Sequence, residues 1–123
     1  MNILSIGFAG FLGALSRYYI SGWVYALCGS KFPYGTLAVN VLGSLILGFI
    51  YTLTLDRAVL SPELRVAITV GFLGSLTTFS TFSLETYNLI YEGSYILSIV
   101  NVAVNIILSL AAVIAGIALA KTF

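Results

Sequence analysis

Four long apolar stretches, separated by short polar connections, constrain the fold of this chain more than any other feature. They cover residues 2–28, 35–55, 65–91 and 95–120. A helix needs about 20 mostly apolar residues to span a bilayer, and in lipid every backbone polar group must be bonded internally. We therefore predict an all-α polytopic membrane protein in which residues 1–123 form a single domain of four transmembrane helices.

The connections are short and carry the turn-forming residues. They read "GSKFPYG", "DRAVLSPELR" and "YEGS", and the second alone holds four of the nine charged residues. Glycine and proline in such clusters are strong signals for turns. Four spans with connections of this size leave no room for an attached soluble domain, and they place both termini on the same side of the membrane.

Composition excludes several classes of function. Charged residues make up 7% of the chain, against about 25% in soluble domains, and a net charge of +1 gives no basic patch for nucleic acid. There is no histidine and a single cysteine, Cys28, which excludes an intrachain disulfide and a His/Cys metal site. The first apolar stretch lacks the basic start of a signal peptide, so we expect it to be retained as a span.

The charges flanking the spans give only a weak preference for one orientation. Three basic residues, Arg57, Arg65 and Lys121, lie on the side of the termini, against Lys31 and Arg17 toward the other side. Such a difference is a modest signal under the positive-inside rule. Four helices of this length enclose no evident pathway by themselves, so we expect a homo-oligomer in the cell membrane.

The segment "GSLTTFSTFS", residues 74–83, is the most unusual part of the third span. Six of its ten residues carry hydroxyls and it begins with a glycine. Ser and Thr side chains can bond backbone groups in non-helical conformations, and irregular backbone is tolerated in a membrane only beside protein or a water-filled cavity. We predict a break in the helix between Gly74 and Ser80, with carbonyl oxygens left free for a cation. The alternative is a continuous helix whose hydroxyls bond back to their own carbonyls.

Phe79 and Phe82 lie three residues apart within this segment and can share one helix face. Aromatic residues in spans are often packing or lipid-facing residues. These two stand among hydroxyls, and the positive edge of an aromatic ring can line an anion path without binding the ion tightly.

Polar side chains also occur inside the second and fourth spans. Asn40 lies in "GTLAVNVLGS", and Asn101, Asn105 and Ser109 follow one another at intervals of four residues, on one helix face. Such groups must face protein or water, because exposure to lipid is costly. They can donate hydrogen bonds to an anion, or they can bond neighbouring helices together.

Arg17 is the only charge inside the first span, and Glu85 is the only carboxylate well inside a span. Arg17 can anchor the helix by extending to the interface, or attract anions at a pore mouth. The spans offer no convincing acid and base pair for an enzyme.

Three motifs together resemble the Fluc (CrcB) family of fluoride channels: "GALSRY" in the first span, "GTLAVNVLGS" in the second and "GFLGSLTTFSTFSLE" in the third. The resemblance covers all four spans in length and order. The fourth span is similar only loosely, since the family typically has tyrosine and serine where this chain has Asn101 and Asn105.

The resemblance implies a fluoride-selective passive channel that exports fluoride from the cytoplasm. It implies an antiparallel homodimer in the inner membrane, with two pores and a central structural sodium ion. By position, Phe79, Phe82 and Asn40 look like pore residues, and Asn101, Asn105 and Ser109 look like the family's polar track. Gly74 and Thr77 look like the residues whose carbonyls hold the sodium ion, and Arg17 looks like the arginine near the aqueous vestibule.

A small four-helix proton-coupled multidrug exporter is the competing hypothesis. That mechanism requires a membrane carboxylate in a binding chamber, usually early in the chain. The first two spans have none, and Glu85 is poorly placed for the role.

Overall fold

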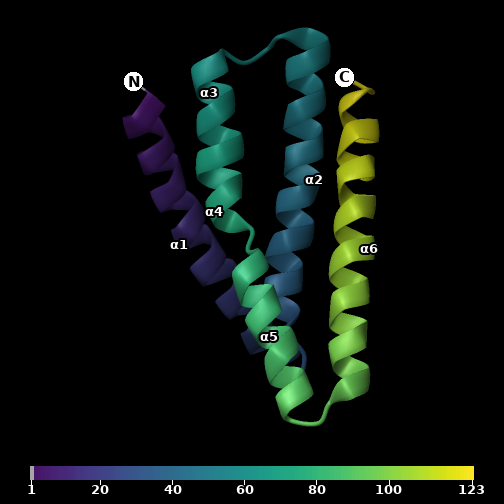
Figure 1. The fold of residues 1–123 in the computed structure, drawn as a ribbon. Coiled ribbons are helices and arrows are strands. Elements are labelled where there is room, and N and C mark those ends of the chain that lie inside the picture. Colours follow the sequence, from purple (N-terminus) through teal and green to yellow (C-terminus); the bar gives the residue numbers. More distant parts are fainter. Residues whose placement is uncertain (1) are drawn as a thin grey trace.

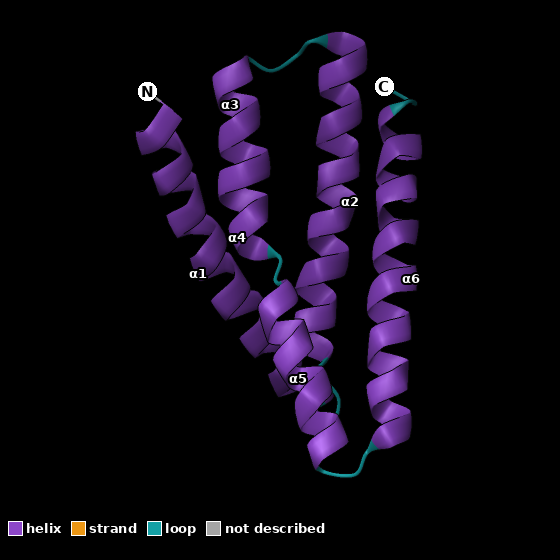
Figure 2. Ribbon diagram, in the orientation of Figure 1, coloured by secondary structure: helices purple, strands orange, loops and turns teal. Residues whose placement is uncertain are grey.

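The computed structural model describes residues 2–123, and within that range the only regular secondary structure is helical, with no β-strand. Helices α1 (Asn2–Cys28), α2 (Tyr34–Arg57) and α6 (Tyr95–Ala120) are continuous, and the third span, Pro62–Tyr91, is built from several pieces. All four are long and apolar enough to cross a membrane, which confirms the predicted fold class. Both termini and the connection after α2 lie at one end of the bundle (Figures 1 and 2).

Tight turns join the spans at the opposite end. Gly29 follows α1 with φ of +86°, and Gly93 follows the third span with φ of +85°. These are left-handed conformations that residues with a Cβ adopt only with strain. The two glycines therefore allow each helix to end abruptly, so that the next can return through the membrane within a few residues.

The third span begins at Pro62, three residues before the expected start at Arg65. Ser61 caps this end, because its side chain accepts a hydrogen bond from the backbone N–H of Leu64, and proline at the first helical position fits the preset φ of a helix. The Ser-Pro pair therefore starts the helix inside the segment that we expected to be loop.

The predicted break in the third span is present. Helix α3 (Pro62–Val66) leads into a π-helix, η1 (Ala67–Leu73), and then into a single turn, α4 (Gly74–Leu76). Thr77 and Thr78 are extended, with ψ of 159° and 122°, before α5 (Phe79–Tyr91) continues the span. The π-helix has no counterpart in the sequence-based prediction.

Close backbone approach holds the bundle together. Helices α2 and α6 run side by side (Figure 1), where a Cβ on Gly48 would overlap the carbonyl of Val113 and one on Gly116 would overlap the carbonyl of Leu45. A Cβ on Gly13 of α1 would likewise overlap the carbonyl of Phe72 in η1. In lipid, helices associate through such van der Waals packing of small residues rather than through a hydrophobic force.

Replacing Gly48 with alanine should destabilise the protein, because α2 and α6 must separate to admit the methyl group. Overpacking of this kind costs about 1–3 kcal/mol. The matched control is Gly22→Ala, since a Cβ at Gly22 meets no heavy atom within 4 Å. Thermal unfolding of the purified variants in detergent should show a lower melting temperature for Gly48→Ala alone. Equal melting temperatures for the two variants would contradict the packing described here.

Candidate functional site at the helix break

The backbone at the break exchanges its helical hydrogen bonds for bonds to side chains. In an unbroken helix the N–H of Thr78 would donate to the carbonyl of Gly74, and that of Thr81 to the carbonyl of Thr77. Here the Thr78 N–H donates to Asn40 Oδ1 at 2.8 Å, and the Thr81 N–H donates to Thr78 Oγ1 at 3.1 Å. The carbonyls of Gly74 and Thr77 are thus released from these helical donors.

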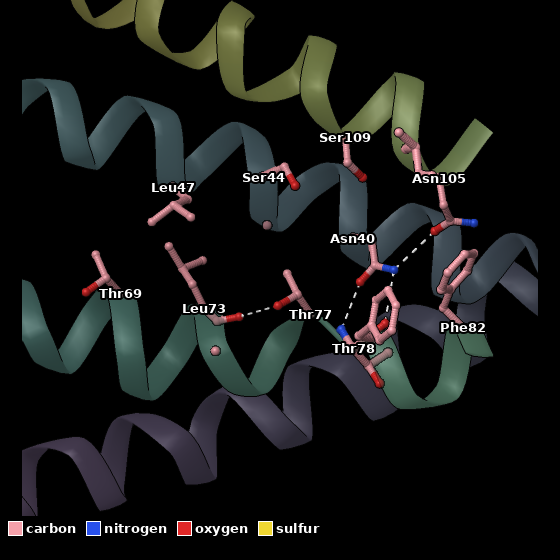
Figure 3. A pocket seen from close by; sticks show the side chains of 14 residues that line it. Asn40, Ser44, Leu47, Thr69, Leu73, Thr77, Thr78, Phe82, Asn105 and Ser109 are labelled. Atoms are coloured by element: carbon pink, nitrogen blue, oxygen red, sulfur yellow. Dashed lines mark hydrogen bonds between the residues drawn. The ribbon is translucent and has the colours of Figure 1, made fainter. Parts of the chain in front are cut away.

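Asn40 binds the extended segment through both ends of its carboxamide. Besides accepting from the Thr78 N–H, it donates from Nδ2 to the Thr78 carbonyl at 3.2 Å (Figure 3). The same Nδ2 donates to Asn105 Oδ1 at 3.1 Å. Asn40 therefore substitutes for helical partners at Thr78 and ties α2 to both α5 and α6. The sequence left two roles open for Asn40, hydrogen bonding between helices and anion binding, and these contacts are the first of the two.

A chain of hydrogen bonds continues from Asn40 through the bundle. Asn105 Nδ2 donates to Asn101 Oδ1 at 2.9 Å, and Asn101 Nδ2 donates to Thr86 Oγ1 at 2.9 Å. Asn101 and Asn105 are buried, with 1% and 6% of their surface exposed. The four-residue spacing therefore does place these two asparagines together against protein rather than lipid.

Sequence reasoning missed Thr86, which ends this chain on α5. Its signal was available, because Thr78, Phe82 and Thr86 follow one another at intervals of four residues. That spacing places Phe82 and Thr86 on one face of α5, after the N-cap residue Thr78, and this face is turned toward α6 at Thr86.

Phe79 and Phe82 lie beside each other at the start of α5. Their ring centroids are 5.4 Å apart and the rings are inclined at 53°. Phe82 is buried, with 9% of its surface exposed, whereas Phe79 is 78% exposed. The three-residue spacing thus brings the rings together, but one of them projects from the subunit and offers a large apolar surface.

A cleft at the break, here called the polar cleft, collects most of the predicted site residues (Figure 3). It has a volume of about 340 Å³ and opens onto the surface of the subunit. Its lining consists of Asn40, Gly43, Ser44, Leu47, Thr69, Leu73, Gly74, Thr77, Thr78, Phe79, Phe82, Asn105, Ile106 and Ser109. These residues are all uncharged and most of the exposed lining is apolar, so hydroxyls, amides and backbone groups supply the polar contacts of the cleft.

Two of the predicted site residues lie outside this lining. Asn101 is buried behind Asn105, to which it is hydrogen-bonded. Arg17 lies on α1, and its Nε donates to the carbonyl of Ser75 in α4 at 2.9 Å. Its predicted place beside an aqueous vestibule stays a prediction.

Glu85 lies in a separate cavity of about 290 Å³, toward the end of the bundle with the tight turns. Tyr25, Ser30, Lys31, Asn88 and Glu92 are among its other lining residues. The hydroxyl of Tyr25 donates to Glu85 Oε2 at 2.8 Å, while Oε1 is buried without a hydrogen-bond partner. The carboxylate on which the exporter hypothesis depends is thus not part of the polar cleft.

Residues 4–117 match the family model described as "CrcB-like protein, Camphor Resistance (CrcB)". The chain belongs to this family. It is 48% identical over 120 residues to the fluoride-specific ion channel FluC of Geotalea daltonii, covering 98% of this chain and 97% of that protein. The proteins of the same name from Geotalea uraniireducens, 49% identical over 120 residues, and Geobacter metallireducens, 46% identical over 121 residues, are similar over nearly their whole lengths. The chain is a multi-pass membrane protein.

Replacing Asn40 with leucine should loosen the break, because the N–H and carbonyl of Thr78 lose their partner together. The contact is partly buried, so the loss should not exceed the about 1–3 kcal/mol that a fully buried unsatisfied polar group costs. Hydrogen exchange at the Thr78 amide should therefore accelerate, and the melting temperature of the purified protein should fall. Asn88→Leu, which makes the same change at the other cavity, is the control. Unchanged exchange at Thr78 in Asn40→Leu would show that Asn40 does not hold the segment.

Proposed function

We propose that this chain forms a passive, fluoride-selective channel that exports fluoride from the cytoplasm. The observation that carries the proposal is the uncharged polar cleft at the helix break, in a chain nearly half identical to proteins named fluoride-specific ion channels. Liposomes that contain the purified protein should release fluoride much faster than chloride. Equal release of the two ions, or no release of fluoride, would overturn the proposal.

The chemistry of the cleft suits a small anion that holds its water strongly. Such an ion crosses a membrane only where donors replace its hydration shell, and conduction also requires that each site bind weakly enough to release it. Fixed positive charge deep in the path would trap the ion, whereas hydroxyls, amides and ring edges would not. Because a membrane potential of 100 mV, negative inside, favours anion exit by about 2.3 kcal/mol, export needs no coupled energy source.

The asparagines would bind the ion by exchanging hydrogen bonds to protein acceptors for hydrogen bonds to the anion. Both hydrogens of Asn40 Nδ2 are engaged, by Thr78 and Asn105, and Asn105 Nδ2 is engaged by Asn101. In this proposal a passing anion replaces one of these acceptors, so the chain of hydrogen bonds supplies donors that are already oriented. Ser109, which lines the same cleft, adds a hydroxyl on the face of α6 that carries Asn101 and Asn105.

An antiparallel homodimer is the assembly that we propose. The polar cleft opens onto the surface of the subunit, and the exposed ring of Phe79 stands at its edge. A second subunit placed against this face would cover Phe79 and enclose the cleft as a pore. The weak charge bias between the two sides supports insertion in both orientations, and two such subunits would form two pores.

A structural sodium ion at the dimer axis is the final part of the proposal. Its support is that the N–H groups that would engage the carbonyls of Gly74 and Thr77 in a helix are diverted to Asn40 and Thr78. Oxygen ligands suit a hard cation. The hydroxyl of Thr77 bonds the carbonyl of Leu73, so the backbone of Thr77 rather than its side chain would hold the ion. Sodium would supply a positive charge that balances carbonyl oxygens from two subunits.

Replacing Phe79 or Phe82 with isoleucine should abolish most fluoride efflux from liposomes, while the protein still purifies in its native assembly. Isoleucine keeps the apolar character but removes the ring edge, and a swap of this kind costs less than about 1.5 kcal/mol in stability. Phe49→Ile is the control, since Phe49 packs against Phe123 away from the cleft. Near-normal efflux through folded Phe79→Ile and Phe82→Ile variants would refute their assignment to the path.

Cysteine labelling should test the dual orientation. The weak charge bias predicts that both orientations insert. In a Cys28→Ser background, a cysteine placed at Ser94, in the connection before α6, should therefore react in about half of the molecules when an impermeant reagent is added outside intact cells. A cysteine at Val59, in the connection after α2, should give the same fraction. Complete labelling at one position with none at the other would rule out the antiparallel dimer.

A further inference from the structure

Arg17 engages a carbonyl that the helix break sets free. Its Nε donates to the carbonyl of Ser75 at 2.9 Å, in a partly buried contact between α1 and α4. In an unbroken helix that carbonyl would accept from the N–H of Phe79, but Phe79 is the first residue of α5, beyond the extended segment. The guanidinium also stands at the carbonyl end of a helical segment, where the macrodipole favours a positive charge.

Two glycines of α1 bring Arg17 within reach of this carbonyl. A Cβ on Gly13 would overlap the carbonyl of Phe72, and a Cβ on Gly10 would lie 3.3 Å from Ser75 Oγ. The backbone of α1 therefore lies directly against the residues that precede the break. Arg17 lies one helical turn beyond Gly13, so this close contact fixes its position relative to Ser75.

We propose that Arg17 is a positioning residue for the cation site, an inference that rests on the proposed function. By donating to the Ser75 carbonyl, Arg17 stabilises the broken arrangement, in which that carbonyl lacks its helical donor, and so disfavours re-forming the turn across the break. The same turn, once re-formed, would return the Thr78 and Thr81 N–H groups to the carbonyls of Gly74 and Thr77. Arg17 thus keeps the carbonyls of Gly74 and Thr77 available for the cation, although it contacts neither of them.

The positioning role and the charge of Arg17 have opposite effects on sodium binding. A fixed positive charge near the site repels a cation, so a residue acting through charge alone would weaken sodium binding, and its removal would tighten it. A residue that positions the carbonyls has the reverse effect, and its removal would weaken binding. The sign of the change therefore distinguishes the two.

The experiment measures the melting temperature of the purified full-length protein in detergent, without fluoride, as NaCl replaces N-methylglucamine chloride at constant ionic strength. Sodium should stabilise the wild-type protein, because a ligand that binds only the folded state raises its stability. Arg17→Met should raise the NaCl concentration for half-maximal stabilisation at least about tenfold, equivalent to about 1.4 kcal/mol. Arg17→Gln, which keeps an amide donor, should give a smaller rise. Lys31→Met, which removes a positive charge from the connection between α1 and α2, should leave the value unchanged.

An unchanged or lower half-maximal concentration in Arg17→Met would overturn the inference. If that variant does not fold, Arg17→Gln decides the matter in the same way. No stabilisation of the wild-type protein by sodium would overturn both the cation site and the role of Arg17. Fluoride efflux from liposomes is measured separately, so a failure of the channel proposal itself remains distinguishable.

Discussion

The pairing of one side-chain amide with one exposed peptide unit is the interaction on which the rest of this structure depends. Thr78 stands in extended backbone within a membrane span, where a backbone N–H or carbonyl left without a partner is costly. The carboxamide of Asn40 meets both. Because that side chain comes from α2, the break is stable only while α2 and α5 remain in register.

The remaining polar groups near the break follow from this pairing. Asn40 is held by Asn105, Asn105 by Asn101, and Asn101 by Thr86, so that α2, α5 and α6 share one hydrogen-bonded network. On the other side of the break Arg17 bonds the carbonyl of Ser75 from α1. Backbone groups that a continuous helix would satisfy locally are satisfied here by side chains of two other helices, α1 and α2, which joins the local irregularity to the packing of the bundle.

The same arrangement explains how an apolar chain can present a polar cleft without charged residues in its lining. The hydroxyls of Thr77 and Ser83 bond back to carbonyls four residues earlier, as the continuous-helix alternative expected, whereas Thr78 Oγ1 caps α5. Both uses of a hydroxyl therefore occur within a few residues. Phe79 and Phe82 complete the cleft with rings rather than charges, which fits a path that an anion enters and leaves.

The sequence by itself determined the number and extent of the spans, because their length and apolarity match the bilayer whatever the tertiary packing. It also indicated where the third span breaks, since a glycine followed by six hydroxyls in nine residues weakens a helix locally, although the bonds that stabilise the break come from α2. The four-residue spacing of Asn101 and Asn105 was enough to place them on one buried face.

The tertiary structure alone decided which distant groups bond to each other. The pairs Asn40 and Thr78, Arg17 and Ser75, and Tyr25 and Glu85 are separated by 38, 58 and 60 residues, respectively. Helix packing brings these pairs together, and no local spacing encodes which distant backbone group an amide or a guanidinium will meet. The π-helix could not be predicted from the sequence for the same reason. It lies where Gly71 packs against the carbonyl of Ile6 in α1, and this contact exists only after the helices have associated.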